Sequence, residues 1–389
     1  MERRAKPDVR PKNPNFSSGP CAKRPGWSPQ CLQHALVGRS HRSSEGRTRL
    51  KSAIDKTVAL LGLPAGYRAA IVPGSDTGAF EMAMWNLLGA RGADVFAWEV
   101  FGRIWLRDAV AELKLPDLRT FDADWGHLPD LARADFNRDI LFAWNGTTTG
   151  VRVPNADWIP DDRAGLVMCD ATSAIFAQDI DFSKIDVLTY SWQKALGGEG
   201  AHGILILSPQ AFERLRTYTP TWPIPKILRL SRAAQVSDDV FEGVTINTPS
   251  MLCVEDYLDA LAWVEDVGGL SVTIARSDAN AMVVYDWIAR TPWVAPLAKD
   301  PATLSNTSIC LRYTGADGRE PPDEIALKKT KAMCELLAKE NAAFDIASYR
   351  GVPAGFRIWT GATIESSDVK ALTAWIDWAH DEVEAQWGA

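Results

Sequence analysis

The sequence predicts an α/β fold, with a large domain built on a mostly parallel central sheet and a smaller α+β domain after it. Three observations indicate this fold class. The chain has 389 residues, which is long for one compact domain. Its first two thirds contain short apolar runs bounded by Gly, Pro, Asp or Asn, which are typical of buried strands. These runs alternate with helical patterns, as in proteins that carry helices on both faces of a parallel sheet.

Six apolar runs are predicted to be strands of the large sheet, namely Arg68–Gly74, Asp94–Glu99, Asp139–Asn145, Gly165–Ala171, Ile185–Trp192 and Gly203–Ser208. Apolar residues at helical spacing predict helices over Lys51–Leu63 and Gly78–Leu88. Ligands bind beyond the carboxyl ends of strands in sheets of this kind, so the polar residues that follow each run are the candidates for a site.

From about residue 270 the pattern becomes a mixture of helices and strands, predicted over Asp278–Arg290, Thr307–Tyr313, Asp323–Asn341 and Gly355–Thr360. A last helix has Ser367 as its expected N-cap and Asp368 at its positive end. We therefore divide the chain into a loose basic N-terminal arm (1–15), a large domain (16–260) and a small C-terminal domain (261–389).

The composition favours a globular enzyme. Hydrophobic residues make up 46% and charged residues 23% of the chain, and the net charge of −7 argues against a nucleic-acid partner. The six cysteines form no CxxC pair, so we expect reduced thiols, no metal site and a cytoplasmic location. No apolar run has the length of a membrane span, and no apolar stretch follows the basic start as in a signal peptide.

A lysine beside a glycine-rich loop is the first candidate for chemistry. In "TYSWQKALGGEGAHG", Lys194 follows a predicted strand and precedes the loop. A neutral lysine amine in a pocket forms an imine with an aldehyde. Ser191 and Gln193 offer polar groups that suit a phosphate. A surface lysine before a flexible turn gives the same pattern, so this motif needs a second one beside it.

Asp170 supplies the second motif. It ends the predicted strand in "GLVMCDA", where its side chain points into the ligand-binding crevice of an open sheet. A carboxylate there suits the nitrogen of a pyridine ring, which it keeps protonated. Capping of the next turn is the alternative. The pair of Asp170 and Lys194 on successive strands is more specific than either residue alone.

Three further segments end predicted strands with small polar or aromatic residues. In "PGSDTGAFEMAMW", Gly74 and Ser75 precede a helix whose N-terminus suits a phosphate, unless Asp76 simply caps that helix. Thr147 in "NGTTTG" is placed to contact a cofactor ring. Phe101 can stack on a flat ring, although packing in the core is an equal alternative.

These motifs, in this order, resemble the class V, fold-type I aminotransferases that use pyridoxal 5'-phosphate (PLP), and within them a divergent branch of the phosphoserine aminotransferase family. The resemblance covers nearly the whole chain. Four more segments carry it, "NFSSGPCAKRPGW" (Asn15–Trp27), "SHRS" (Ser40–Ser43), "FEGVTINTPS" (Phe241–Ser250) and "YRGVPAGFR" (Tyr349–Arg357). The segment "GSDTGAF" departs from it, because many members carry an arginine there that helps to bind substrate phosphate.

The resemblance implies roles for single residues. Lys194 would hold the cofactor as an imine and Asp170 would pair with its ring nitrogen. The other residues expected at the cofactor are Gly74, Ser75, Phe101, Thr147 and Gln193, with Asn247 and Thr248 reaching the cofactor phosphate of a partner subunit in a homodimer. Substrate phosphate and carboxylate would be bound by His41, Arg42, Arg350 and Arg357, since arginine offers bidentate, charge-assisted donors.

The implied activity is transfer of an amino group between glutamate and 3-phosphohydroxypyruvate, giving O-phosphoserine and 2-oxoglutarate in serine biosynthesis. The alternatives are another class V activity, such as serine– or alanine–glyoxylate transamination, a cysteine desulfurase, and a non-catalytic protein on the same fold. The sequence leaves open a second, 4-carbon phosphorylated substrate, 4-phosphohydroxythreonine, from pyridoxine biosynthesis.

Overall fold

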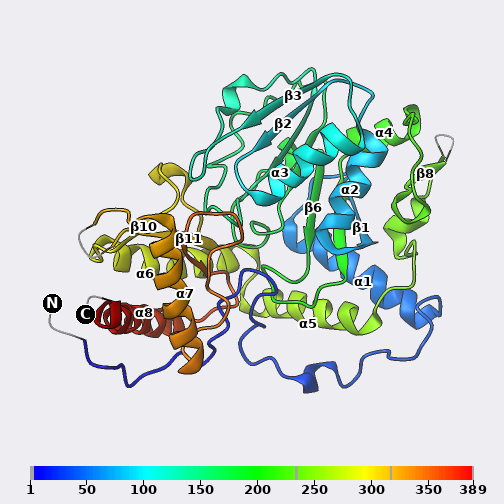
Figure 1. Ribbon diagram of the computed structural model, residues 1–389. Helices are drawn as coiled ribbons and strands as arrows, with labels where there is room; N and C mark the ends of the chain where they lie inside the picture. Colours follow the sequence, from blue (N-terminus) through cyan, green and yellow to red (C-terminus); the bar gives the residue numbers. More distant parts are fainter. Residues whose placement is uncertain (1–3, 233–234, 316–317, 388–389) are drawn as a thin grey trace.

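The computed structural model describes residues 4–232, 235–315 and 318–387, so residues 1–3 of the predicted arm lie outside it. Within these ranges the central sheet has seven strands, and helices cover both of its faces (Figure 1). The strands are β1 (Arg68–Pro73), β2 (Ala93–Ala97), β3 (Leu118–Asp122), β4 (Asp139–Ala143), β5 (Val167–Asp170), β6 (Val187–Ser191) and β7 (His202–Leu207).

The strand order is β1-β7-β6-β5-β4-β2-β3. β7 runs antiparallel to both of its neighbours, β1 and β6, and every other pair in the sheet is parallel. The predicted α/β class with a mostly parallel sheet is confirmed. All six predicted strands are present, whereas β3 was not predicted. Only Phe121 of β3 is buried, because this strand lies at the edge of the sheet and lacks a continuous apolar run.

The helices are α1 (Ser44–Leu61), α2 (Ser75–Leu87), α3 (Val100–Arg107), α4 (Pro209–Thr217), α5 (Met251–Val267), α6 (Leu270–Ala289), α7 (Asp323–Lys339) and α8 (Ser366–Trp387). α1 begins before the predicted residue 51, since its first turns are polar and show no apolar spacing. The Ser43 hydroxyl caps this helix by accepting a hydrogen bond from the Gly46 amide.

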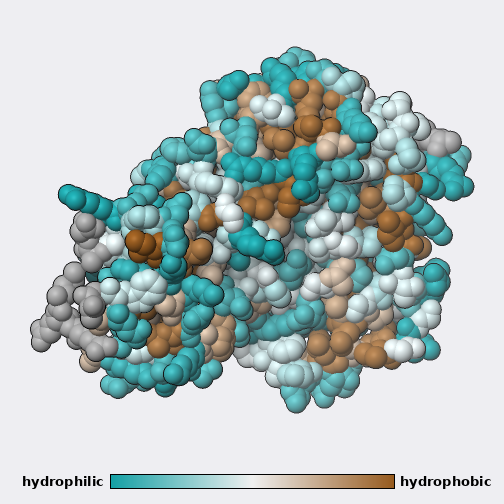
Figure 2. Space-filling view, viewed as in Figure 1, coloured by the Kyte–Doolittle hydropathy of each residue, from teal (hydrophilic) through white to brown (hydrophobic). Residues whose placement is uncertain are grey.

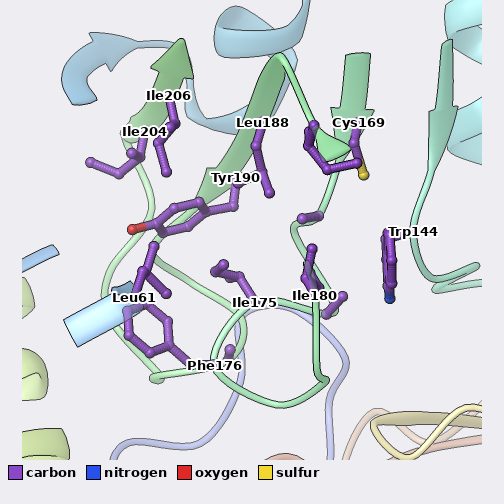
Figure 3. Packing of buried hydrophobic residues seen from close by; sticks show 14 of the residues in the cluster. Leu61, Trp144, Cys169, Ile175, Phe176, Ile180, Leu188, Tyr190, Ile204 and Ile206 are labelled. Atoms are coloured by element: carbon purple, nitrogen blue, oxygen red, sulfur yellow. The ribbon is translucent and has the colours of Figure 1, made fainter. Parts of the chain in front are cut away.

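The central sheet separates two apolar cores, because successive side chains of a strand point to opposite faces. Leu188 and Tyr190 of β6 belong to the core that α1 and α5 cover, and so do Ile204 and Ile206 of β7 (Figure 3). Val187 of β6 belongs instead to the core under α2, α3 and α4. This alternation holds the strands in one register, so the residues at their carboxyl ends have fixed positions.

A second, antiparallel sheet comprises β10 (Val294–Pro296), β11 (Ser308–Tyr313) and β12 (Gly355–Trp359). It forms a third core with α6, α7 and α8. A short pair, β8 (Ser231–Arg232) and β9 (Gln235–Val236), lies apart from both sheets (Figure 1). The predicted boundary after residue 260 falls within α5, and the division of the chain there stays a prediction.

The expected N-cap of the last helix is wrong by two positions. α8 begins at Ser366, and the Asp368 and Val369 amides both donate to the Glu365 carbonyl, so Glu365 is the capping position and Ser367 lies inside the first turn. The Ser366 hydroxyl donates to Asn280 Oδ1 on α6, a tertiary contact that the local pattern does not reveal.

Residues 4–15 follow the outside of the small core and are not the loose arm that we expected. The Arg4 guanidinium pairs with Asp381 at 2.8 Å. The Lys12 amide donates to Asp368 Oδ1 at 2.8 Å, close to the start of α8. These contacts join the N-terminal segment to the last helix, which lies beside it in Figure 1.

The outer surface is mixed in character. Figure 2 shows hydrophilic residues over much of one face, with hydrophobic residues in separate groups. Among the described residues, none of the helices combines the length and the apolar character needed to cross a membrane.

Candidate active site

A cavity of about 270 Å³ lies beyond the carboxyl ends of β4, β5 and β6, where the N-termini of α2 and α3 also point. This is the position at which open α/β sheets bind ligands. The cavity brings together seven residues that the sequence proposed for a site, namely Ser75, Phe101, Thr147, Asp170, Gln193, Lys194 and Arg357.

Lys194 lies in the loop after β6 and is only 8% exposed. Its Nζ donates to the Thr147 hydroxyl at 2.9 Å and lies 5.3 Å from the centre of the Phe101 ring. Burial lowers the pKa of Lys194, and the positive charge of Arg357 lowers it further. The negative charge of Asp170 acts in the opposite direction. A lysine in this setting reaches the neutral, nucleophilic form more readily than one on the surface.

Asp170 is the last residue of β5 and is buried. Trp105 Nε1 donates to its Oδ2 at 3.2 Å, and the Thr172 amide donates to its Oδ1 at 3.0 Å. Two donors on different elements therefore hold the carboxyl group in one orientation. Trp105 was not predicted. It lies four residues after Phe101 on α3, a helical spacing that places both rings on the same side of the helix.

The start of α2 forms one end of the cavity. Gly74 precedes the helix with φ of 84°, a left-handed conformation that favours glycine, and Ser75 and Thr77 line the cavity just after it. Within the described chain, Ser191 Oγ and Gln193 Oε1 also line the cavity and are buried without a hydrogen-bond partner. Buried polar atoms are normally paired, so the Ser191 hydroxyl is available to donate to a polar ligand such as a phosphate, whereas the Gln193 carbonyl oxygen needs a donor.

Two residues from other parts of the chain close the cavity. Arg357 comes from β12 of the small sheet, and its guanidinium lies 5.3 Å from the centre of the Tyr349 ring. Tyr349 in turn lies 5.7 Å from the Phe101 ring. Arg357 Nε is buried and has no partner among the described residues. This side chain is therefore available to bind an anionic group.

The remaining predicted residues lie elsewhere in this chain. Gly74 adjoins the cavity without lining it, and five other described residues also stay outside the lining, namely His41, Arg42, Asn247, Thr248 and Arg350. His41 and Asn247 are half-buried, whereas Arg42, Thr248 and Arg350 are exposed. Their roles stay predictions. In the described part of the chain, His, Cys, Asp and Glu side chains form no group of three or more that could hold a metal.

Comparison with known proteins adds sequence relatives and structural neighbours. No family model matches the sequence. The chain is 52% identical over 379 residues to the phosphoserine aminotransferase of Methanosarcina mazei, an alignment that covers 97% of this chain and 100% of that protein. The phosphoserine aminotransferase of Methanosarcina barkeri matches with the same identity and coverage.

Solved structures show the same fold at low identity. A phosphoserine aminotransferase from Cytophaga hutchinsonii superposes with a TM-score of 0.77 at 19% identity, covering 96% of this chain and 98% of that one. An alanine–glyoxylate aminotransferase from Nostoc sp. superposes with a TM-score of 0.75 at 16% identity, covering 97% of each chain. The fold is that of the aminotransferases. From its 52% identity over nearly the full length, the chain belongs to the phosphoserine aminotransferase family.

Proposed function

We propose that the protein is a PLP-dependent enzyme that transfers an amino group between glutamate and 3-phosphohydroxypyruvate, giving O-phosphoserine and 2-oxoglutarate. The observation that carries the proposal is the 52% identity with the Methanosarcina mazei phosphoserine aminotransferase over 379 residues. The cavity supports it independently, because a buried lysine of lowered pKa and a buried carboxyl group line the same space.

PLP fits the polar groups of the cavity. Its phosphate would lie at the start of α2 near Ser75, where the Ser191 hydroxyl and the Gln193 side-chain N–H would donate to it. Its ring would lie against Phe101, with Asp170 at the ring nitrogen. Thr147 would contact the ring hydroxyl, and Lys194 would hold the cofactor as an imine. When bound, PLP supplies an electron sink for the carbanion formed at the substrate α-carbon.

The protein's own side chains would carry the proton transfers. Lys194 Nζ, once free and neutral, would take the proton from the substrate α-carbon as a general base and deliver it to the cofactor carbon as a general acid. Thr147 accepts a hydrogen bond from Nζ and so limits the positions that the amine can reach. Arg357 offers two parallel donors to the substrate α-carboxylate, which orients the α-carbon toward Nζ.

We also propose roles for the predicted residues that do not line the cavity of this chain. His41, Arg42 and Arg350 would bind substrate phosphate, and Asn247 and Thr248 would serve the cofactor phosphate of the other subunit in a homodimer. Such an enzyme would act in serine biosynthesis in the cytoplasm. The titration described below, repeated with a 4-carbon phosphorylated substrate, tests for a second role in pyridoxine biosynthesis.

A half-reaction titration tests the proposal. The purified protein is saturated with PLP, and the visible absorbance of the bound cofactor is followed while O-phosphoserine, serine or alanine is added. We expect O-phosphoserine to bleach the absorbance at far lower concentration than the other two. An equal or better response to serine or alanine would contradict the phosphoserine assignment and favour another class V aminotransferase.

A further inference from the structure

A second aspartate lies beside Asp170 in the cavity. Asp76 is in the first turn of α2, lines the cavity and is only 6% exposed. Asp170 ends β5, and its pairing partner on β6 is Thr189. The local pattern allows Asp76 to cap a helix, but Gly74 occupies the capping position, so the Asp76 side chain is free for another role.

The two carboxyl groups differ in their donors. Both oxygens of Asp170 accept hydrogen bonds, from Trp105 Nε1 and from the Thr172 amide. Asp76 Oδ1 is buried and has no hydrogen-bond partner among the described residues. A buried carboxylate oxygen without a donor makes ionisation more costly, whereas donors at both oxygens make it less costly. The surroundings therefore favour a neutral Asp76 and suit a negative charge on Asp170.

The electrostatic surroundings act in the same direction. Burial raises the pKa of Asp76 well above its usual range, and the charge of Asp170 and a hydrogen bond with its carboxyl group raise it further. The Thr189 and Thr172 hydroxyls oppose this rise. Two neighbouring carboxyl groups rarely ionise together, since each charge disfavours the other.

We propose that Asp76 is a positioning residue that keeps its proton and donates it in a hydrogen bond to Asp170. The pair then presents one negative charge, centred on Asp170, to the ring nitrogen of the cofactor. The inference rests on the proposed role of Asp170 toward PLP. It adds a third donor, from α2, to the two that already hold the Asp170 carboxyl group.

Infrared difference spectroscopy on the apoprotein tests where the proton is. We expect a protonated-carboxyl C=O band at neutral pH in the wild-type protein that is absent from Asp76→Asn and that shifts in D₂O. Asp377→Asn is the matched control, because Asp377 on α8 also has an unpaired, buried oxygen and a pKa raised by burial, but lies outside the cavity lining. This control should leave the Asp76 band in place.

Cofactor affinity tests what the proton does. Asp76→Asn keeps the size and a donor, so we expect its dissociation constant for PLP to stay within about three-fold of the wild-type value. Asp76→Ala removes the donor, and we expect a dissociation constant about ten-fold higher or more. Asparagine also replaces aspartate at a helix start, so rescue by asparagine supports the inference only together with the Asp76-dependent infrared band. Asp377→Asn should bind PLP as the wild type does.

Two results would overturn the inference. One is the absence of a carboxyl band that depends on Asp76, a readout that needs no cofactor and therefore stands even if the Ala variant does not fold. The other is an Asn variant that binds PLP as weakly as the Ala variant. If the wild-type protein does not bind PLP, the proposed function is contradicted. The inference about the Asp76 proton is then still tested by the infrared band, which does not depend on PLP.

Discussion

Glu99 is a buried acid in the candidate site that has donors and yet resists ionisation. It is 1% exposed, and it accepts hydrogen bonds from the Gly102 amide and the Thr148 hydroxyl. Burial outweighs these donors and raises the pKa of Glu99 to about 7, with a further rise from the charge of Asp170. The ordinary value for glutamate is near 4.5, so its charge state changes within the range where enzymes work.

The raised pKa of Glu99 gives a stability change of known sign. Between about pH 4.5 and 7 the folded protein keeps a proton on Glu99 that the unfolded chain has released, so this residue makes folding less favourable as the pH rises. Glu99→Gln cannot ionise. We expect the variant to gain about 1–3 kcal/mol of unfolding free energy relative to the wild type on going from pH 5 to pH 8.

Urea unfolding at the two pH values measures this difference. Glu213→Gln, on an exposed position of α4, is the control and should show no such gain. A Glu99→Gln variant whose stability relative to the wild type is the same at pH 5 and pH 8 would contradict the account of Glu99.

At the scale of one element, α3 brings two rings to the cavity from neighbouring turns. Phe101 faces Lys194, and Trp105 donates to Asp170. Trp105→Phe keeps an aromatic ring and removes that donor. We expect cofactor binding to weaken by about 1–2 kcal/mol, roughly five- to thirty-fold in the dissociation constant, which absorbance titration with PLP measures.

Trp222→Phe is the matched control for that change. Trp222 Nε1 donates to the Trp85 carbonyl, away from the cavity lining, so its loss should leave PLP affinity unchanged. If Trp105→Phe bound PLP as the wild type does, Trp105 would be a packing residue only.

The sequence predicts the elements of the central sheet well and the contacts between elements poorly. The six apolar runs identify strands because burial on both faces leaves a continuous apolar signature. The edge strand β3 has only Phe121 buried and lacks that signature. Lys194 and Asp170 were found because each lies at the carboxyl end of such a run or just after it. Trp105, Glu99 and Tyr349 were not, since their role depends on how distant segments pack.

At the scale of the whole molecule, the cavity draws on both sheets. Arg357 comes from the small sheet and was expected through the family resemblance, not through any local pattern. His41, Arg42, Asn247, Thr248 and Arg350 lie outside the cavity lining of this one chain, so the proposals for them depend on contacts with a second copy or on movement of the surrounding segments.

The N-terminal segment packs against the last helix, and a buried acid on that helix accepts hydrogen bonds from the segment. Asp368 is 5% exposed and accepts hydrogen bonds from the Lys12 and Asn13 amides. Asp368→Ala leaves both amides unpaired, and we expect a loss of about 1–3 kcal/mol in the free energy of unfolding, measured with urea.

Glu340→Ala is the comparison for Asp368→Ala. Glu340 pairs with Lys6 and Arg10, whose side chains are about half exposed, so water screens these pairs and little change is expected. Equal effects of the two substitutions would contradict the view that buried amide contacts, and not the surface ion pairs, hold the segment.

Covalent mapping of the cofactor tests the central claim most directly. The protein is incubated with PLP, reduced with borohydride and digested, and the modified peptide is identified by mass spectrometry. The account predicts a pyridoxyl group on Lys194 in the wild-type protein and none at this position in Lys194→Ala. Modification of another lysine, or of none in a folded wild-type protein, would contradict the assignment of this cavity as the active site.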